Sequence, residues 1–151
     1  MKRKLYLLLL SALGFSAAAC DRENEPEQVC MYGTPRIDFR IQGKVTDTAG
    51  RPIAGIEVRN EDRNYGSDNT VLTDEKGLYD ISGSAFSTVF DLSFRDLDGP
   101  ENGGDFATET LSLKLTAQEQ KAPGEGGWFR GTYARTGADV ILTEKSPAQE
   151  Q

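Results

Sequence analysis

The chain contains no histidine, and this absence excludes several kinds of active site. Without histidine there can be no Ser-His-Asp or Cys-His nucleophile pair, and the usual zinc sites are also removed. Paired carboxylates can still catalyse glycoside hydrolysis, but such enzymes need a sizeable cleft, which a single small domain rarely provides. The sequence therefore predicts a protein that is not an enzyme.

Basic residues are in the minority, with 17 Lys and Arg against 24 Asp and Glu. Three of the basic residues are Lys2, Arg3 and Lys4, so the net charge falls from -7 to -10 once they are removed with the signal peptide described below. Binding to nucleic acid or to anionic lipid requires a basic surface. We expect no nucleic-acid partner, and membrane attachment must come from acyl chains.

Long apolar runs are absent except at residues 5–15, near the N-terminus. This run is shorter than the roughly 20 apolar residues that cross a bilayer. It follows the basic residues 2–4 and precedes the small residues 16–19, an arrangement typical of a bacterial secretory signal. The mature chain would then begin close to residue 20.

Cys20 stands directly after the small residues, and this segment resembles the lipobox of bacterial lipoproteins. The resemblance implies that the lipoprotein processing machinery cuts before Cys20 and that lipid (palmitate) is attached to Cys20. One departure is Ala17, where lipoboxes usually carry Leu. The alternative is an ordinary signal peptide, cut at residues 17–19, which leaves Cys20 as a free N-terminal thiol.

Four segments are expected: a signal peptide at 1–19, an acidic flexible tether at 20–36, a β-sandwich domain at 37–145 and a disordered tail at 146–151. Between Cys20 and Val29 there are four acidic residues and no apolar one, so this stretch cannot pack into a core. Acidic residues at this place also resemble the export signal of surface lipoproteins in the Bacteroidetes. That resemblance implies a protein of the cell envelope, lipid-anchored in the outer membrane and exposed at the surface.

Alternation of apolar and polar residues predicts short strands along the domain. Residues 37–45 and 53–58, separated by a turn at 48–51, are expected to form one hairpin, and residues 70–73 and 78–82, joined by a tight turn at 74–77, a second. The other expected strands are 90–94, 111–115, 128–133 and 140–143, and the expected loops are 61–69 and 116–127, the latter with at most one helical turn. About seven short strands indicate an all-β fold, an antiparallel β-sandwich.

Two motifs in the first half of the domain resemble the carboxypeptidase regulatory-like domain. They are Ile41-x-Gly43-x-Val45-x-Asp47-x-x-Gly50-x-Pro52-Ile53-x-Gly55-Ile56-x-Val58 and Thr73-Asp74-x-x-Gly77-x-Tyr79-x-Ile81. The resemblance implies a transthyretin-like sandwich and a chiefly non-catalytic module of exported and cell-surface proteins. Transthyretin-like hydrolases of purine metabolism rely on histidines, so that branch is excluded.

The segment 30–35, Cys-Met-Tyr-Gly-Thr-Pro, lies between the tether and the first expected strand. With the lipobox and the acidic sandwich, it resembles a group of Bacteroidetes lipoproteins named for a radical S-adenosylmethionine (radical SAM) enzyme encoded beside them. The resemblance implies a radical SAM enzyme as partner and Cys30 as a site of modification. The alternative is that this segment only packs over the end of the sandwich.

A loop at residues 96–105 gathers side-chain oxygens among glycines, and calcium prefers such ligands. The candidate ligands are Asp96, Asp98, Glu101, Asn102 and Asp105. Their spacing is not that of an EF-hand, and the alternative is a solvated loop in which Asp, Asn and Gly serve turns. No other cofactor is expected.

These patterns predict a lipid-anchored β-sandwich at the cell envelope that acts as a non-catalytic binding or structural module. The alternative function is that of a protein substrate, modified at the Cys30 segment by a dedicated radical SAM enzyme.

Overall fold

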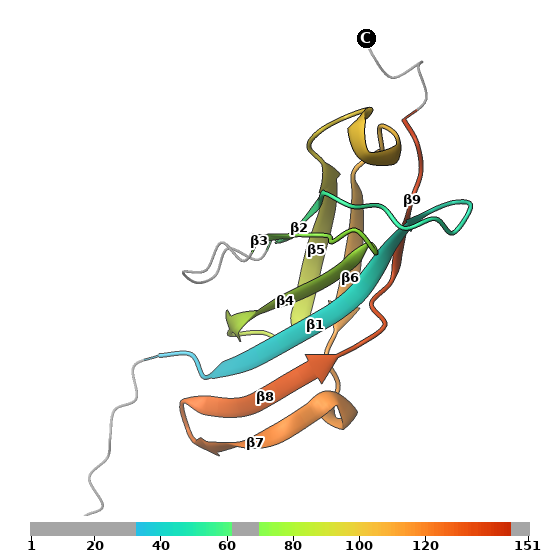
Figure 1. The fold of residues 1–151 in the computed structure, drawn as a ribbon. Coiled ribbons are helices and arrows are strands. Elements are labelled where there is room, and N and C mark those ends of the chain that lie inside the picture. Colours follow the sequence, from blue (N-terminus) through green and yellow to red (C-terminus); the bar gives the residue numbers. More distant parts are fainter. Residues whose placement is uncertain (1–32, 62–69, 146–151) are drawn as a thin grey trace, which may run out of the picture. The chain divides into compact units, whose positions relative to one another are not determined.

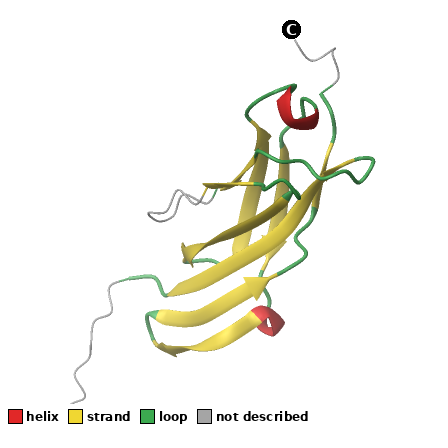
Figure 2. Cartoon of the chain, viewed as in Figure 1, coloured by secondary structure: helices red, strands yellow, loops and turns green. Residues whose placement is uncertain are grey.

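The computed structural model describes residues 33–61 and 70–145, which are built almost entirely from short strands (Figures 1 and 2). The elements in chain order are β1 (Arg36–Asp47), β2 (Ile56–Asn60), β3 (Thr70–Leu72), β4 (Leu78–Ala85), β5 (Val89–Asp96), the 3-10 turn η1 (Glu101–Gly103), β6 (Glu109–Lys114), the 3-10 turn η2 (Ala117–Glu119), β7 (Gln120–Gly126), β8 (Phe129–Arg135) and β9 (Val140–Leu142). No helix in these two ranges is long and apolar enough to cross a membrane.

The strands form two sheets, and the expected all-β sandwich is confirmed. Sheet I has the order β4-β1-β8-β7, with β9 beside the last residues of β1, and sheet II has the order β3-β2-β5-β6. Sheet II is antiparallel throughout. In sheet I, β1 pairs with β4 in the antiparallel sense but with β8 and β9 in the parallel sense, so this sheet is mixed rather than purely antiparallel.

The core lies between the two sheets, and the alternation along β1 places every second residue in it. Phe39 of β1 contacts Phe90 of β5 with ring centroids 4.5 Å apart, and Tyr79 of β4 meets Phe94 of β5 edge-on at 5.4 Å. Both pairs join sheet I to sheet II. Such aromatic contacts stabilise by about 0.5–1.5 kcal/mol beyond the area that they bury.

The expected hairpin of residues 37–45 with 53–58 is wrong, because β1 and β2 belong to different sheets. The chain does return beside β1 after the turn, where Ile53 N donates a hydrogen bond to Val45 O. It then leaves for sheet II at Gly55, which has φ +77°. A positive φ is easily adopted only by glycine, so the sequence 53–56 allows this crossing.

The turn at 74–77 is confirmed, whereas the second expected hairpin is wrong. Asp74 N donates to Leu78 O and Gly77 N donates to Asp74 O, as in a tight turn. The flanking strands nevertheless separate, because β3 pairs with β2 in sheet II and β4 with β1 in sheet I. This turn therefore links the two sheets of the sandwich.

The expected loop at 116–127 contains the predicted single helical turn, η2, but its second part is the strand β7. β7 pairs with β8 through two irregular steps in register. A Cβ atom on Gly124 would lie 1.8 Å from the carbonyl oxygen of Phe129, so the pairing needs a residue without a side chain at that position. The sequence predicted a loop because glycine and proline are disfavoured inside regular strands. They are tolerated in β7 because its pairing with β8 is irregular, which the sequence does not reveal.

Candidate functional site

Gly43 and Tyr79, one residue from each motif, both lie close to the segment that joins β8 to β9. Tyr79 Oη donates a hydrogen bond of 2.5 Å to the carbonyl oxygen of Ala138, in the segment that joins β8 to β9. A Cβ atom on Gly43 would lie 2.1 Å from the same oxygen. Burial raises the pKa of Tyr79, so the phenol stays protonated and available as a donor.

Thr73, also a motif residue, ties together the two ends of the crossing between the sheets. Its hydroxyl is buried, donates to Ile53 O at 2.8 Å and accepts from Ile56 N at 3.0 Å. Its backbone N–H donates to Ile56 O. Buried polar groups that are fully paired in this way specify one geometry of the chain.

Three aspartates organise the loops at one end of the sandwich, which we call the aspartate end. Asp47 accepts hydrogen bonds from Ala49 N and Arg51 N, and Asp74 accepts from Lys76 N and Leu78 N. The third, Asp96, follows β5 and is described below. Short acidic side chains serve tight turns because they replace missing backbone partners.

Asp47 also forms an ion pair with Arg51, at 2.6 Å between Oδ2 and Nε. Burial alone would raise the pKa of Asp47, but the hydrogen bonds from Arg51 and Ala49 outweigh it and hold the pKa below its ordinary value. The carboxylate therefore stays charged in the folded protein at neutral pH.

The loop at 96–105 lies at the same end, and its candidate ligands Asp96, Asp98 and Asp105 all interact with other groups of the protein. Asp96 Oδ1 accepts from Asp98 N at 3.2 Å and Gly99 N at 3.1 Å, and Asp96 Oδ2 accepts from Phe106 N at 2.9 Å. Asp105 forms an ion pair with Lys145. Asp96 thus holds the loop closed onto the start of the following segment.

The remaining two candidates are Glu101, which is exposed at the start of η1, and Asn102, within η1. In the described ranges, no three Asp, Glu, His or Cys side chains form a group that could hold a metal ion. The geometry as it stands supports the turn-forming role of the loop, and calcium binding stays a prediction.

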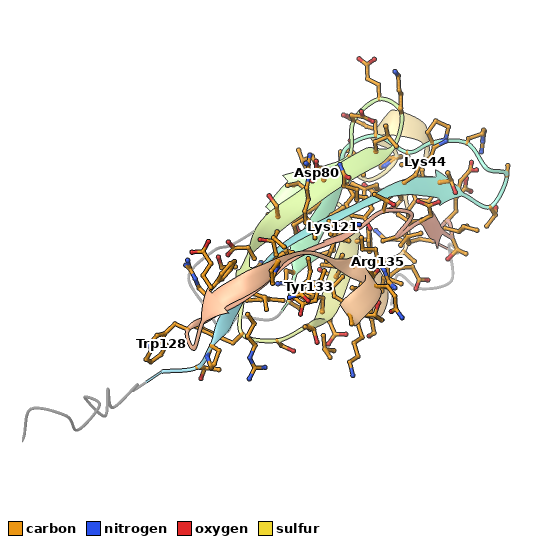
Figure 3. The ribbon with its side chains drawn as sticks, turned by 90° about the horizontal axis from the view of Figure 1, so that it is seen from below. Lys44, Asp80, Lys121, Trp128, Tyr133 and Arg135 are labelled. Atoms are coloured by element: carbon orange, nitrogen blue, oxygen red, sulfur yellow. The ribbon has the colours of Figure 1, made fainter. Side chains whose placement is uncertain are left out.

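A shallow pocket of about 500 Å³ lies on the outer face of sheet I. Lys44, Asp80 and Asp139 line it, and Lys44 and Asp80 lie on adjacent strands in Figure 3. Arg40 and Gln42 both donate hydrogen bonds to Asp80. The bond from Arg40, assisted by the one from Gln42, holds the pKa of Asp80 below its ordinary value, against a small effect of burial.

A second pocket of about 630 Å³ lies on the other side of the segment 136–139, between that segment and β6. Leu111 and Lys114 contribute from β6, and Arg135 and Glu119 form an ion pair of 2.5 Å in it. The lining residues come from segments far apart in the sequence. The first pocket is the less local of the two, because Lys44, Asp80 and Asp139 meet in it only through the tertiary fold.

The opposite end of the sandwich, where β1 and β8 begin, is organised by Trp128, and we call it the Trp128 end. Arg36 N donates to Trp128 O at 2.9 Å, and the indole ring lies against Gly33. The Arg36 guanidinium lies over the ring of Phe129, 5.8 Å from its centroid. Trp128 is at the extremity of the β7–β8 turn in Figure 3, away from Lys44 and Asp80.

Cys20 and Cys30, the predicted lipidation site and the predicted modification site, lie outside the described residues. The same holds for residues 62–69 of the expected loop and for the C-terminal segment 146–151.

Comparisons with known proteins identify no family for this chain. No protein-family model matches the chain, and no curated protein matches it. Among solved structures, a DUF3823 family protein from Parabacteroides merdae is similar, with 18% sequence identity and a TM-score of 0.38. The match covers 74% of this chain and 46% of that protein, so the chain corresponds to less than half of its length.

Proposed function

We propose that this protein is a lipid-anchored β-sandwich of the cell envelope, with a domain of the carboxypeptidase regulatory-like type that serves as a non-catalytic binding or structural module. The observation that carries the proposal is the position of Cys20. It follows a signal pattern directly and precedes the first strand, β1, by only an acidic stretch of chain. Lipid on Cys20 would hold the folded domain at a membrane surface, most simply the outer membrane.

The roles of the motif residues agree with a module of this kind. Gly43, Thr73 and Tyr79 each have a packing or hydrogen-bonding partner within the sandwich, and Asp47 and Asp74 cap turns. These residues therefore have structural roles within the fold.

Binding is best placed at the two pockets that flank the segment 136–139. Both are open, and charged residues of both signs line each of them: Lys44 and Asp139 in one, Lys114 and Glu119 in the other. Such surfaces suit a polar partner recognised by hydrogen bonds and paired charges rather than a buried apolar ligand.

The anchor is tested by Cys20→Ala, with Cys30→Ala as the matched control. Cell fractionation should show the parent protein and the Cys30→Ala variant with the membranes, and the Cys20→Ala variant released from them. Intact-mass measurement of the parent should show acyl chains on a mature chain that begins at Cys20. A Cys20→Ala variant that stays with the membranes would overturn the proposal.

The same mass measurement separates this function from the alternative of a radical SAM enzyme substrate. In protein from its native host, the peptide spanning residues 29–36 should have its unmodified mass if the domain acts as a module. A mass change on that peptide that requires the intact Cys30 would support the substrate function instead.

A further inference from the structure

Trp128 is the single tryptophan of the chain and is one of the few large apolar side chains on the surface, with 39% of its area exposed. It stands at the turn between β7 and β8, directly after the exposed glycines 126 and 127. One part of its ring is covered by Gly33. The ring stands at the extremity of the β7–β8 hairpin, and more than a third of the residue is exposed.

Two arginines belong to this end of the sandwich, although the chain as a whole is acidic: the N–H of Arg36 donates to Trp128 O, and Arg130 follows Trp128 by two residues. Arg36 and Arg130 are both exposed, and Arg36 is held by its stacking over Phe129. Glu125, close to the same turn, is also exposed, whereas Lys121 lies at the other end of β7, level with Tyr133. The Trp128 end thus combines an indole with positive charge, whereas the aspartate end carries Asp47, Asp74 and Asp96 and their loops.

The path of the chain places this end nearest to the proposed anchor. Gly33, which packs against Trp128, is 13 residues from Cys20. Even fully extended, 13 residues span at most about 45 Å, and a flexible chain of that length has a mean span of only about 20 Å. The Trp128 end is therefore confined close to whatever surface holds the lipid on Cys20.

We propose that the Trp128 end docks on the lipid surface itself, with the Trp128 indole in the interfacial region and the guanidinium groups of Arg36 and Arg130 on lipid phosphates. This inference rests on the proposed lipid anchor. Docking orients the sandwich with its aspartate end and the pocket at Lys44 and Asp139 away from the membrane.

The chemistry of Trp128, Arg36 and Arg130 suits binding to a lipid surface. Tryptophan is enriched at membrane interfaces because its ring is apolar and its N–H needs a polar partner. Arginine is attracted to the headgroup region by charge and forms paired hydrogen bonds with phosphate. One indole and two arginines bind weakly on their own, but the tether raises their effective concentration at the surface and so populates the docked state.

The single tryptophan makes the test direct. Lipidated full-length mature protein is reconstituted into phosphatidylcholine vesicles, with or without bromine on the acyl chains, and its fluorescence is recorded. We expect the Trp128 emission to shift to the blue on reconstitution, to lose intensity in the brominated vesicles and to become less accessible to acrylamide. In Arg36→Glu/Arg130→Glu protein these changes should be reduced.

A matched control moves the tryptophan to the other end. Ile141 of β9 is 62% exposed and lies beside the last residues of β1, so Ile141→Trp in a Trp128→Phe background places one exposed indole at the aspartate end. Its emission should be the same in brominated and plain vesicles. Circular dichroism and the melting temperature establish that each variant is folded.

The outcomes separate docking from anchoring. Flotation of the vesicles reports the anchor. If the protein does not float with the vesicles, the anchor proposal fails. Docking is then tested separately by coupling Cys20 of a Cys30→Ser variant to a maleimide lipid, which attaches the chain at the same residue. Attached protein whose Trp128 remains as accessible to acrylamide as in solution would overturn the docking proposal, as would equal quenching of the tryptophan at position 141. Protection of Trp128 without vesicles would show contact between protein copies and would also overturn it.

Discussion

At the aspartate end of the sandwich, three carboxylates accept hydrogen bonds from the backbone of the loops. At the Trp128 end, the contacts are instead made by an indole and by an arginine that lies over an aromatic ring. Asp47, Asp74 and Asp96 each accept at least two backbone N–H groups. At the other end, Trp128 contacts Gly33 and Arg36 lies over Phe129, and much of both side chains remains exposed.

The difference shows that a residue type typical of a binding site indicates such a site only once its partners within the protein are known. The acidic end attracts attention in the sequence as a site for a cation, yet Asp96 has a complete set of partners in its own loop. The Trp128 end draws less attention in the sequence, yet its indole is partly exposed at the surface. Four predictions test this comparison.

The largest effect is expected at Gly77 of the aspartate end. It has φ +71°, and a Cβ atom there would lie 2.4 Å from the carbonyl oxygen of Val45, so Gly77→Ala should lower the free energy of unfolding by about 2–3 kcal/mol. Gly50 has φ +80° with open space around it, and Gly50→Ala should cost only about 1 kcal/mol. Urea unfolding measures both, and equal losses would contradict the close contact at Val45.

A smaller effect is expected from the carboxylate caps. Asp96→Ala removes the acceptor of three backbone N–H groups and should cost about 1–2 kcal/mol. The matched control is Glu125→Ala, an exposed acid of the β7–β8 hairpin, which should stay within about 0.5 kcal/mol of the parent. If the two variants are equally stable, the loop at 96–105 does not depend on its cap.

Acid should weaken the fold through Asp47, Asp80 and Glu119, whose pKa values are all lowered in the folded state. A lowered pKa contributes stability above the ordinary value, 3.8 for Asp and 4.5 for Glu, and this contribution is lost as the pH falls through the folded value. The melting temperature should therefore decrease below about pH 4.5. In Asp47→Asn the decrease below about pH 4 should be shallower, and an unchanged slope would show that Asp47 contributes nothing to it.

The smallest effect is expected from calcium, and the structure improves the choice of variants. The sequence predicts binding at 96–105, in the range of about 10⁻⁴–10⁻³ M that is usual for extracellular modules. Asp96→Asn would disturb the loop with or without a metal, and Asp98 also has an interaction of its own, so the exposed Glu101 is the better probe and Glu101→Gln the better variant. Calorimetry should show binding that this variant removes, and no heat at millimolar calcium would leave the loop with a structural role alone.

Strand positions were largely predictable, because alternation of apolar residues directly reflects one buried face. The turn at 74–77 was also predictable, since an Asp four residues before Leu78 and a glycine at positive φ are local features. The strand β7 was not, because its glycines and proline fit only against the irregular backbone of β8. The pocket on the outer face of sheet I was not predictable either, as Lys44, Asp80 and Asp139 come from distant parts of the sequence and meet only in the tertiary structure.

The sequence by itself determined the class of fold, since its apolar residues recur with a period of two and can be buried only by packing sheet on sheet. It also determined the local geometry wherever an Asp or Gly acts within a few residues, as at Asp47 and Gly77. Only the tertiary structure decided that β1 and β2 lie in different sheets and that β8 runs parallel to β1. The physical reason is that long-range packing selects which strands pair, and the sequence of a single strand does not specify its partner.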